Sequence, residues 1–249
     1  MSILREGEKL EDLQRNNLKI IQKKDAYRFS TDAVLLAHFV KLSKEDAMVV
    51  DLGTGSGILP ILLSALYPRA AFVGIEIQEE LADMAKRSVE LNGLENSVQI
   101  IHGDLRRITD YLKPNCADTV VTNPPYIPKD GGLVSPNRSI ALAKQEILCS
   151  LEDIFYAANR ILKGRGSMFM IHRPQRLGDL CCLGRKYDLE PKGMRFVHPK
   201  AGREAHMVLI EFVKNSLPGM KVFPPLVVLK ENGKYTQEVE EMYYGEKGQ

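Results

Sequence analysis

The sequence predicts an α/β fold in which a mostly parallel sheet carries helices on both faces. Segments rich in β-branched residues alternate with helix-compatible segments along most of the 249 residues. A glycine-rich turn at residues 53–57 separates one of these strands from the helix that follows it. Two strand-like segments near residue 200 follow each other with no room for a helix, which indicates a closing antiparallel hairpin.

The first half of the series has clear boundaries. A strand is expected at about 48–52, and its helix ends near Tyr67-Pro68 because proline stops a helix. A second strand is expected at 71–76. Its helix runs over 79–92 and stops where Asn92 precedes a glycine. The third strand covers 98–104 and finishes with Gly-Asp.

The second half contains a long loop and the closing strands. A fourth strand at 118–122 precedes a loop at 127–144 that is rich in Gly, Pro and Ser. A helix is then expected, followed by a fifth strand, a second helix and the two strands of the hairpin. Their expected ranges are 145–162, 167–171, 174–187, 194–198 and 206–212. A strand-like segment, 226–229, lies in the tail.

The whole chain, 1–249, is predicted to form a single domain. Residues 1–45 form an N-terminal segment, expected to place a short hairpin or loop across the ligand site and to begin a capped helix after Phe29. Residues 46–213 form the core that binds the ligand. Residues 214–249 form a C-terminal extension to which the sequence assigns no role.

Composition and charge limit the class of protein. The 44% hydrophobic and 27% charged content is ordinary for a globular domain. No apolar run approaches the roughly 18 residues of a membrane span, and the first residues lack a signal-peptide core, so a cytoplasmic protein is expected. Residues 126–213 carry 14 Lys and Arg against 9 Asp and Glu. That surplus suits a phosphate backbone, although an ordinary solvated surface is the alternative.

The four cysteines do not predict a metal site. Cys116, Cys149, Cys181 and Cys182 form no Cys-x-x-Cys pair, and no His pair completes a zinc set. Buried free thiols are expected, and no metal.

The segment Asp51-Leu52-Gly53-Thr54-Gly55-Ser56-Gly57 predicts a ligand site. Glycines permit positive φ and a close backbone approach to a ligand, and the helix that follows offers unpaired N–H groups. Glu76 ends the second strand 25 positions after Asp51, where an acid can bind ribose hydroxyls, and Asp104 ends the third. The carboxyl ends of parallel strands meet at one edge, so a nucleotide-like ligand is predicted there.

Asn123-Pro124-Pro125-Tyr126 follows the fourth strand and points to chemistry on a planar amine. The lone pair of such a nitrogen is conjugated, which makes it a poor nucleophile. The Asn123 side-chain oxygen and the Pro124 carbonyl can each accept one N–H, and these bonds strengthen as positive charge develops. The prolines stiffen the loop, and Tyr126 offers a face on which a planar group can stack.

These two motifs together resemble those of class I S-adenosylmethionine (SAM) methyltransferases that act on adenine, cytosine or glutamine amines. The resemblance implies a Rossmann-like fold with a seven-stranded, mostly parallel sheet and a C-terminal antiparallel hairpin, with SAM as cofactor. It assigns catalysis to the Asn-Pro-Pro-Tyr residues. The implied cofactor-binding residues are Thr31, Asp32, Asp51, Gly53, Thr54, Gly55, Gly57, Glu76, Ile77, Asp104, Leu105 and Asn123.

The chain as a whole resembles bacterial tRNA adenine-N6 methyltransferases that modify the adenine next to the anticodon of valine tRNA. The matching stretches beyond the shared motifs are residues 27–33, 138–141 with Glu146, and 202–205. The core leaves no room for the target-recognition domain of DNA methyltransferases. Only 47 residues precede the first core strand, and they begin with a polar segment instead of the helical N-terminal domain of release-factor glutamine methyltransferases. The family implies a tRNA partner, and the basic residues expected to contact it are Arg28, Lys129, Arg138, Arg173 and Arg203.

Two other functions remain open. One is methylation of a glutamine amide, at N5, in a protein substrate. The other is a non-catalytic SAM fold that binds RNA, against which the intact strand-end acids and Asn-Pro-Pro-Tyr argue. The sequence names neither the tRNA, nor the nucleotide, nor the oligomeric state.

Overall fold

The computed structural model describes residues 3–24, 31–125 and 149–245. Within these ranges, five neighbouring strands run parallel in one sheet, with β5 at its edge. They are β3 (Met48–Leu52), β4 (Ala71–Glu76), β5 (Val98–His102), β6 (Ala117–Thr122) and β7 (Leu162–His172). The predicted strands at 48–52, 71–76 and 118–122 are confirmed to within one residue. The third ends at His102, two residues earlier than expected.

The predicted closing hairpin is confirmed. It consists of β8 (Leu189–Lys200) and β9 (Met207–Lys214), and β9 lies antiparallel between β7 and β8. Both strands are longer than predicted. Since β8 runs parallel to the central strands, it ends at the same edge of the sheet as β3 to β7. We call this edge the carboxyl edge.

The predicted count of seven strands is too low. Two strands of the C-terminal extension, β10 (Lys221–Val222) and β11 (Leu226–Leu229), pair in parallel with β8. The described residues thus form a nine-stranded sheet in the order β10-β8-β9-β7-β6-β3-β4-β5, with β11 also on β8. The open edge of β8 explains the addition, since Leu226 becomes fully buried against it.

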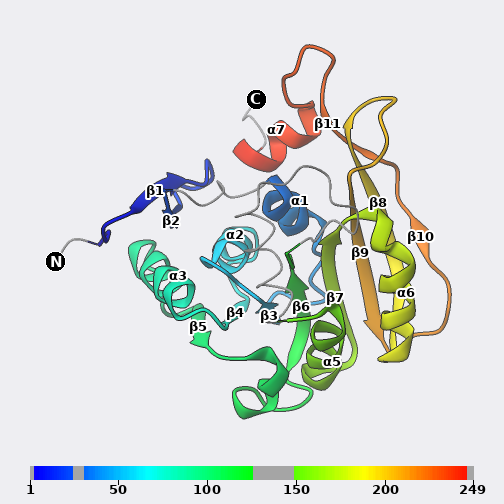
Figure 1. Cartoon of the computed structure of the whole chain (residues 1–249), viewed down its shortest axis with the longest axis horizontal. Helices are drawn as coiled ribbons and strands as arrows, with labels where there is room; N and C mark the ends of the chain where they lie inside the picture. Colours follow the sequence, from blue (N-terminus) through cyan, green and yellow to red (C-terminus); the bar gives the residue numbers. More distant parts are fainter. Residues whose placement is uncertain (1–2, 25–30, 126–148, 246–249) are drawn as a thin grey trace, which may run out of the picture.

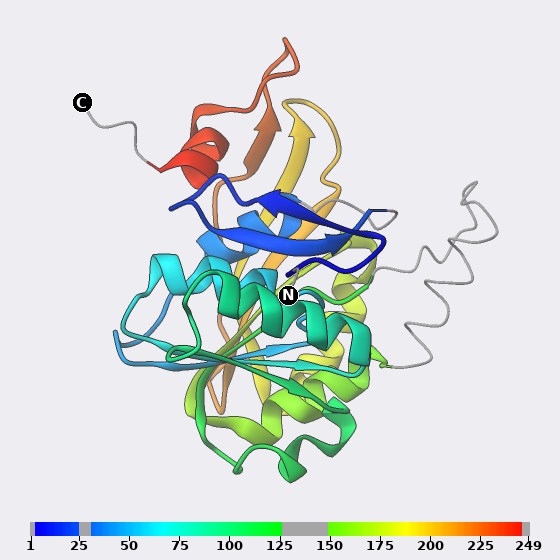
Figure 2. The same cartoon turned by 90° about the vertical axis from the view of Figure 1, so that its left-hand side faces the viewer.

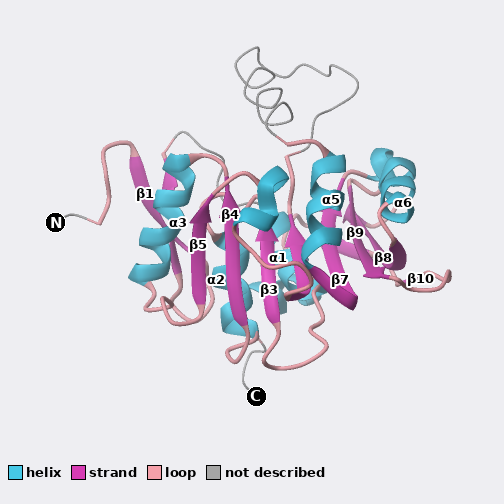
Figure 3. Cartoon of the chain, turned by 90° about the horizontal axis from the view of Figure 1, so that it is seen from below, coloured by secondary structure: helices cyan, strands magenta, loops and turns pink. Residues whose placement is uncertain are grey.

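Helices cover both faces of this sheet, as predicted (Figure 1). One face carries α1 (Thr31–Phe39), α2 (Ile58–Leu66) and α3 (Glu79–Leu91), and the other carries α5 (Leu151–Ile161) and α6 (Leu177–Lys186). Short 3-10 helices, η1 (Leu105–Asp110) and η2 (Pro174–Arg176), follow β5 and β7. Figure 3 looks at the face that α5 and α6 cover and shows the central strands side by side.

Two boundaries on the α5 side differ from the prediction. The helix expected from residue 145 begins at Leu151, because Ser150 and Asp153 form a reciprocal capping box; residues 145–148 lie outside the described ranges. Strand β7 begins at Leu162 and includes the Lys-Gly-Arg-Gly segment expected as a connection. Its pairing with β6 shifts register there, and Arg165 has a φ of 68°, which marks a bulge.

The predicted N-terminal hairpin is formed by β1 (Glu8–Asp12) and β2 (Lys19–Lys23). Figure 2 shows it lying over α3. The Ile21 N–H donates to Ser88 Oγ at 3.0 Å, and the Arg87 guanidinium pairs with Glu8 at 2.6 Å. The described hairpin thus packs on α3, and residues 25–30, which continue toward α1, lie outside the described ranges. The expected placement of the N-terminal segment across the ligand site therefore stays a prediction, as do the domain boundaries.

The C-terminal extension ends in a helix that the sequence pattern did not predict, α7 (Gln237–Tyr244). Its Val239 and Tyr243 join the same buried cluster as α1, α2 and the turn of the N-terminal hairpin. Both ends of the chain therefore pack on α1, whose first residues belong to the predicted cofactor site.

Candidate cofactor and methyl-transfer site

The glycine turn after β3 is fastened to the end of β4. The backbone N–H groups of Gly53 and Thr54 both donate to the Ile75 carbonyl, at 2.9 and 3.0 Å. Gly53, Gly55 and Gly57 all have positive φ, at 76°, 58° and 85°. A Cβ on either of the first two would meet nothing within 4 Å, so these glycines leave open space for a ligand.

Gly57 allows two helices to pack closely. A Cβ at this position would lie 3.1 Å from the Cβ of Ala85 in α3. The third glycine therefore allows α2 to start directly against α3, and the N-terminus of α2 opens toward the turn.

Glu76 connects the glycine turn to the next two strand ends. Its carboxylate is buried and accepts the N–H of Gly55 at 2.8 Å and that of Gln78 at 2.9 Å. Its own carbonyl accepts the N–H of Gly103, at 2.8 Å, at the end of β5. One acid thus fixes the relative positions of the three segments predicted to surround the cofactor.

Asp51 and Thr54 present buried polar atoms at the same place. Asp51 is 2% exposed and Thr54 4%, and among the described residues neither Asp51 carboxylate oxygen, nor the Thr54 hydroxyl, makes a hydrogen bond. Burial raises the pKa of Asp51 to about 7, and the negative charge of Glu76 adds to this rise while the neighbouring Thr54 hydroxyl opposes it. Buried polar groups without partners are rare in folded proteins and indicate a missing partner.

Asp104 caps η1 and is occupied by its neighbour. Its carboxylate accepts the Arg106 N–H at 3.0 Å, and the Arg106 Nε lies 2.9 Å from both carboxylate oxygens. These bonds hold the pKa of Asp104 below its usual value. An amino group that approaches Asp104 must compete with Arg106 for the carboxylate oxygens. The sequence pattern did not predict this pair, although Arg106 lies only two positions after Asp104.

The remaining predicted contacts of this region also lie at the carboxyl edge. The Ile77 carbonyl follows β4 and lies 3.1 Å from His102 Nε2. Leu105 is buried at the start of η1. Cys149, which lies just before α5, has a pKa raised to about 12, mainly by burial and then by the charges of Asp153 and Asp104.

Asn123 follows β6 directly beside the glycine turn. The Thr122 hydroxyl donates to the Leu52 carbonyl at 2.8 Å and so ties the end of β6 to the end of β3. Pro124 is buried and Pro125 is exposed. The structure thus brings Asn123 and both prolines next to the proposed cofactor site, while Tyr126 lies outside the described residues.

Thr31 and Asp32 open α1. The hydroxyl of Tyr243, in the unpredicted helix α7, donates to Thr31 Oγ1 at 3.1 Å. Asp32 lies close enough to His206 to raise its pKa, although burial outweighs this and leaves the pKa of His206 below its usual value. The start of α1 is therefore held by residues far along the chain, which no local motif indicates.

Two of the predicted RNA contacts lie further along the carboxyl edge. Arg173 follows β7 and its Nη1 donates to the His206 carbonyl at 3.2 Å. Arg203 lies in the β8–β9 turn, and its carbonyl lies 2.6 Å from His198 Nδ1. Both arginines are exposed. The other three, Arg28, Lys129 and Arg138, lie outside the described residues.

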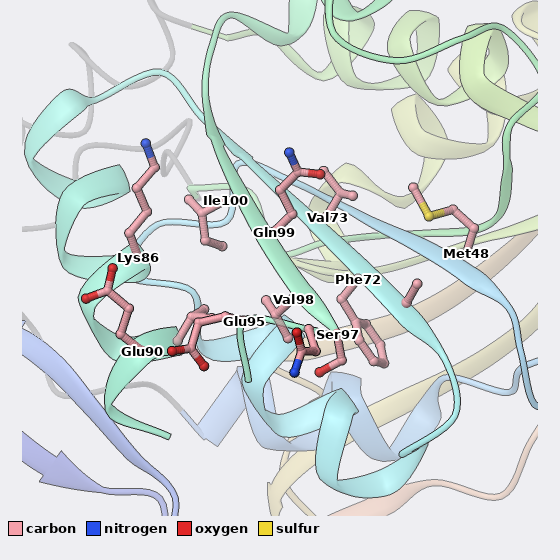
Figure 4. A pocket seen from close by; sticks show the side chains of 13 residues that line it. Met48, Phe72, Val73, Lys86, Glu90, Glu95, Ser97, Val98, Gln99 and Ile100 are labelled. Carbon is pink, nitrogen blue, oxygen red and sulfur yellow. The ribbon is translucent and has the colours of Figure 1, made fainter. Parts of the chain in front are cut away.

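A separate groove of about 590 Å³ lies between α3 and the edge of the sheet (Figure 4). Lys86 and Glu90 of α3 line it on one side, and Val98 and Gln99 of β5 on the other. Its lining includes Ala71 and Val98, the first residues of β4 and β5. The groove therefore extends to the edge of the sheet opposite the carboxyl edge. The groove is distinct from the site at the carboxyl edge.

The thiols differ from the prediction. All four cysteines are free, as expected, but Cys182 is exposed and the other three are only partly buried. Within the described ranges, no group of three or more His, Cys, Asp or Glu side chains is placed to hold a metal ion. The described helices include none long and apolar enough to cross a membrane.

The sheet order and the acids at successive strand ends define a class I SAM-dependent methyltransferase. Residues 29–178 match the methyltransferase small domain family, and the chain belongs to this family. It is 26% identical over 192 residues to the tRNA1(Val) (adenine(37)-N6)-methyltransferase of Porphyromonas gingivalis, covering 75% of this chain and 74% of that one. The enzyme of the same name from Aeromonas salmonicida is 27% identical over 186 residues, with 74% and 76% covered.

A solved structure supports the fold. A predicted O-methyltransferase from Agrobacterium tumefaciens aligns with a TM-score of 0.70 at 22% identity, covering 86% of this chain and 96% of that one. The cofactor of the protein is SAM. The residues present fit it: two glycines leave space beside the turn, and the unpartnered Asp51 carboxyl offers acceptors to a cation.

Proposed function

We propose that this methyltransferase acts on the exocyclic N6 amine of an adenine in tRNA, in the anticodon loop next to the anticodon. The observation that carries the proposal is the position of Asn123 and Pro124. The Thr122–Leu52 hydrogen bond holds them at the end of β6, directly beside the glycine turn. The two relatives named above supply the substrate class, since their names specify adenine in tRNA.

The proposed chemistry follows from hydrogen-bond geometry. When bound, SAM supplies a methyl group on a positively charged sulfur. The Asn123 side-chain oxygen accepts one N–H of the target amine and the Pro124 carbonyl accepts the other. These bonds draw the nitrogen toward tetrahedral geometry and free its lone pair, and they strengthen as the nitrogen becomes cationic. No strong base is required, because the product ammonium is acidic.

The cofactor roles are proposed from the positions of the strand ends. Glu76 binds the ribose hydroxyls while it holds the Gly55 amide. Asp104 and the adjacent Ile77 and Leu105 surround the adenine. Asp51, Thr31 and Asp32 face the methionine end, where the ligand carries its positive charges. Asp51, Glu76 and Asp104 lie at the ends of β3, β4 and β5, at the edge where parallel α/β sheets bind ligands.

Binding of tRNA is proposed to use the basic residues beyond β6. Arg173 and Arg203 stand exposed at the carboxyl edge, on the side away from β5. The target base must leave any stack to reach Asn123, and bases of an anticodon loop are already unpaired, which lowers that cost. A tRNA substrate also agrees with the cytoplasmic location expected from the sequence.

A methyl-transfer assay tests the proposal against its main alternative. The purified chain is incubated with labelled SAM and either transcribed valine tRNA or a protein carrying an accessible glutamine. We expect label in the tRNA, recovered as N6-methyladenosine, and none in the protein. Label in the protein alone assigns the enzyme to glutamine-amide methylation, and label in neither supports the non-catalytic function.

A further inference from the structure

The C-terminal extension carries a cationic turn at the same edge of the sheet as the methyl-transfer site. We call residues Lys230–Lys234 the extension turn. It follows β11, which runs parallel to β8, so it lies at the carboxyl edge with Arg173 and Arg203. Four strand steps separate β6 from β11 in the sheet order, so β7, β9 and β8 lie between Asn123 and the extension turn.

Hydrogen bonds fix the shape of this turn. The Lys230 N–H donates to the Lys234 carbonyl at 2.8 Å, and the Gly233 N–H donates back to the Lys230 carbonyl at 3.0 Å. Gly233 has a φ of 79°, which a tight turn of this kind requires. Both lysines are exposed. The backbone that carries both charges is therefore held in one conformation, and only the lysine side chains need to be ordered by a ligand.

Contacts connect the extension turn to the rest of the edge. The Lys200 Nζ, at the end of β8, donates to the Glu231 carbonyl at 3.3 Å. Arg203 lies in the turn that follows Lys200. Four cationic side chains, Lys200, Arg203, Lys230 and Lys234, thus belong to two adjoining turns. The extension turn itself contains two lysines and one acid, Glu231, which gives it a net charge of +1. On α7, Glu238 forms a bidentate pair with Arg195 at 2.7 and 2.9 Å.

An aromatic groove adjoins the lysines. It has a volume of about 380 Å³, and its lining consists of Leu229, Gly233, Lys234, Tyr235, Glu240 and Tyr244. Tyr244 is 55% exposed, whereas Tyr235 is fixed by stacking on Tyr243 with a centroid distance of 5.2 Å. The carboxylate of Glu240 disfavours a phosphate inside the groove. A flat, uncharged base is the part of a nucleic acid that such tyrosines accept.

We propose that the C-terminal extension is a second RNA-contacting surface, in which the lysines of the extension turn bind backbone phosphates and the aromatic groove accepts an unstacked base. The inference rests on the proposed tRNA substrate and adds to it a role for residues 226–244. It makes the extension part of substrate recognition outside the target nucleotide.

The test compares tRNA binding by charge-reversed variants over a salt series. Lys230→Glu/Lys234→Glu is expected to weaken binding of labelled transcribed tRNA about tenfold at low salt, and to reduce the slope of log affinity against log salt by about 1–2. The control is Lys192→Glu/Lys221→Glu, which reverses two charges near Gly193, about 20 Å along β8 from Lys200. It should bind within twofold of the parent, and both double variants should keep the parental SAM affinity.

The aromatic groove is tested by a separate substitution, whose effect on tRNA binding should not depend on salt. Tyr244→Ala is expected to weaken tRNA binding about five- to tenfold with an unchanged salt slope, because stacking is not electrostatic. Tyr156→Ala, which removes another exposed tyrosine on the opposite face, is the matched control and should bind like the parent.

The outcomes separate this inference from the function on which it rests. If the parent methylates tRNA but the extension variants bind like the parent across the salt series, the second surface is wrong and the function stands. Equal weakening by the Lys192 and Lys221 control also contradicts it. A parent that neither binds nor methylates tRNA overturns both.

Discussion

The Tyr243 hydroxyl donates a hydrogen bond to Thr31 Oγ1 at 3.1 Å, so the last helix of the chain holds the first residue of α1. Because the Thr31 oxygen accepts from Tyr243, its own hydroxyl proton is left to donate elsewhere. Thr31 is one of the residues proposed to face the methionine end of SAM, whose carboxylate is an acceptor.

Removal of this hydroxyl should weaken the cofactor site more than the fold. Tyr243→Phe keeps the ring that stacks on Tyr235 and loses one hydrogen bond of about 1 kcal/mol. We expect the Kd for SAM to rise about fivefold with a small fall in melting temperature, measured by calorimetry and thermal unfolding. A variant with parental SAM affinity would show that Tyr243 serves packing alone.

Glu76 should contribute to both SAM binding and stability. Glu76→Ala leaves the N–H groups of Gly55 and Gln78 without their acceptor, which costs about 1–3 kcal/mol of unfolding free energy. It also removes the proposed ribose contacts, so SAM binding should weaken by roughly 2 kcal/mol, or about thirtyfold. Calorimetry with Glu90→Ala, an exposed acid on α3, provides the control. Unchanged SAM affinity in Glu76→Ala would remove this residue from the site.

Asp51 should make stability depend on pH. Its pKa of about 7 lies above the ordinary 3.8, so the folded chain keeps a proton that the unfolded chain loses. The resulting stabilisation is complete below about pH 4 and is lost as the pH rises through about 7. Asp51→Asn does not titrate, and it should be more stable than the parent at pH 8, by on the order of 2–4 kcal/mol, but little different at pH 4.

The same substitution should weaken SAM binding, because the ionised carboxylate is the form that attracts the positive charges of the cofactor. Urea unfolding at pH 4 and pH 8 together with calorimetry at pH 8 checks both effects. Equal stability differences at the two pH values would contradict the raised pKa.

Replacing Gly57 by alanine should cost more stability than the same replacement at Gly93, a glycine that also has a positive φ. Gly57→Ala combines a φ of 85° with a Cβ only 3.1 Å from that of Ala85. Gly93→Ala, at a φ of 66°, meets nothing within 4 Å, and so reports the backbone cost alone. That cost is about 1–3 kcal/mol, and Gly57→Ala should exceed it by about 1 kcal/mol in urea unfolding. Equal losses would show that α2 and α3 can separate freely.

The elements that carry the site were predictable because their patterns are local. Buried parallel strands appear in the sequence as short β-branched runs, and a polar residue such as Asp51, Glu76 or Asn123 lies at the strand end or one position from it. The extension was harder to predict. Strand β10 has two residues, and α7 depends on the packing of Val239 and Tyr243 against α1, which only the folded chain provides. Likewise, the occupation of Asp104 by Arg106 is a side-chain geometry that spacing does not determine.

The start of α5 and the length of β7 illustrate the same limit. Apolar residues recur at helical spacing before Ser150, but the reciprocal bonds between Ser150 and Asp153 decide where the helix begins. The Lys-Gly-Arg-Gly segment looks like a turn because glycines favour turns, yet it continues β7 as a bulge in which Arg165 takes the positive φ.

The central claim is that Asn123 polarises an adenine amine in tRNA. Asn123→Ala should leave the fold intact, since the residue lies past β6 and outside the glycine turn. Its SAM affinity is measured alongside, because the family resemblance also implies a cofactor contact at Asn123. It removes an acceptor that matters most when the amine becomes cationic, which is worth roughly 1.5–3 kcal/mol. The loss should fall on kcat and kcat/KM together, with little change in tRNA affinity.

Single-turnover methylation of transcribed valine tRNA, with N6-methyladenosine quantified by mass spectrometry, measures this directly. The account predicts that the parent forms N6-methyladenosine next to the anticodon and that Asn123→Ala forms it about ten- to two-hundredfold more slowly. An Asn123→Ala enzyme that transfers methyl at the parental rate, or a parent whose product is another nucleoside, would contradict it.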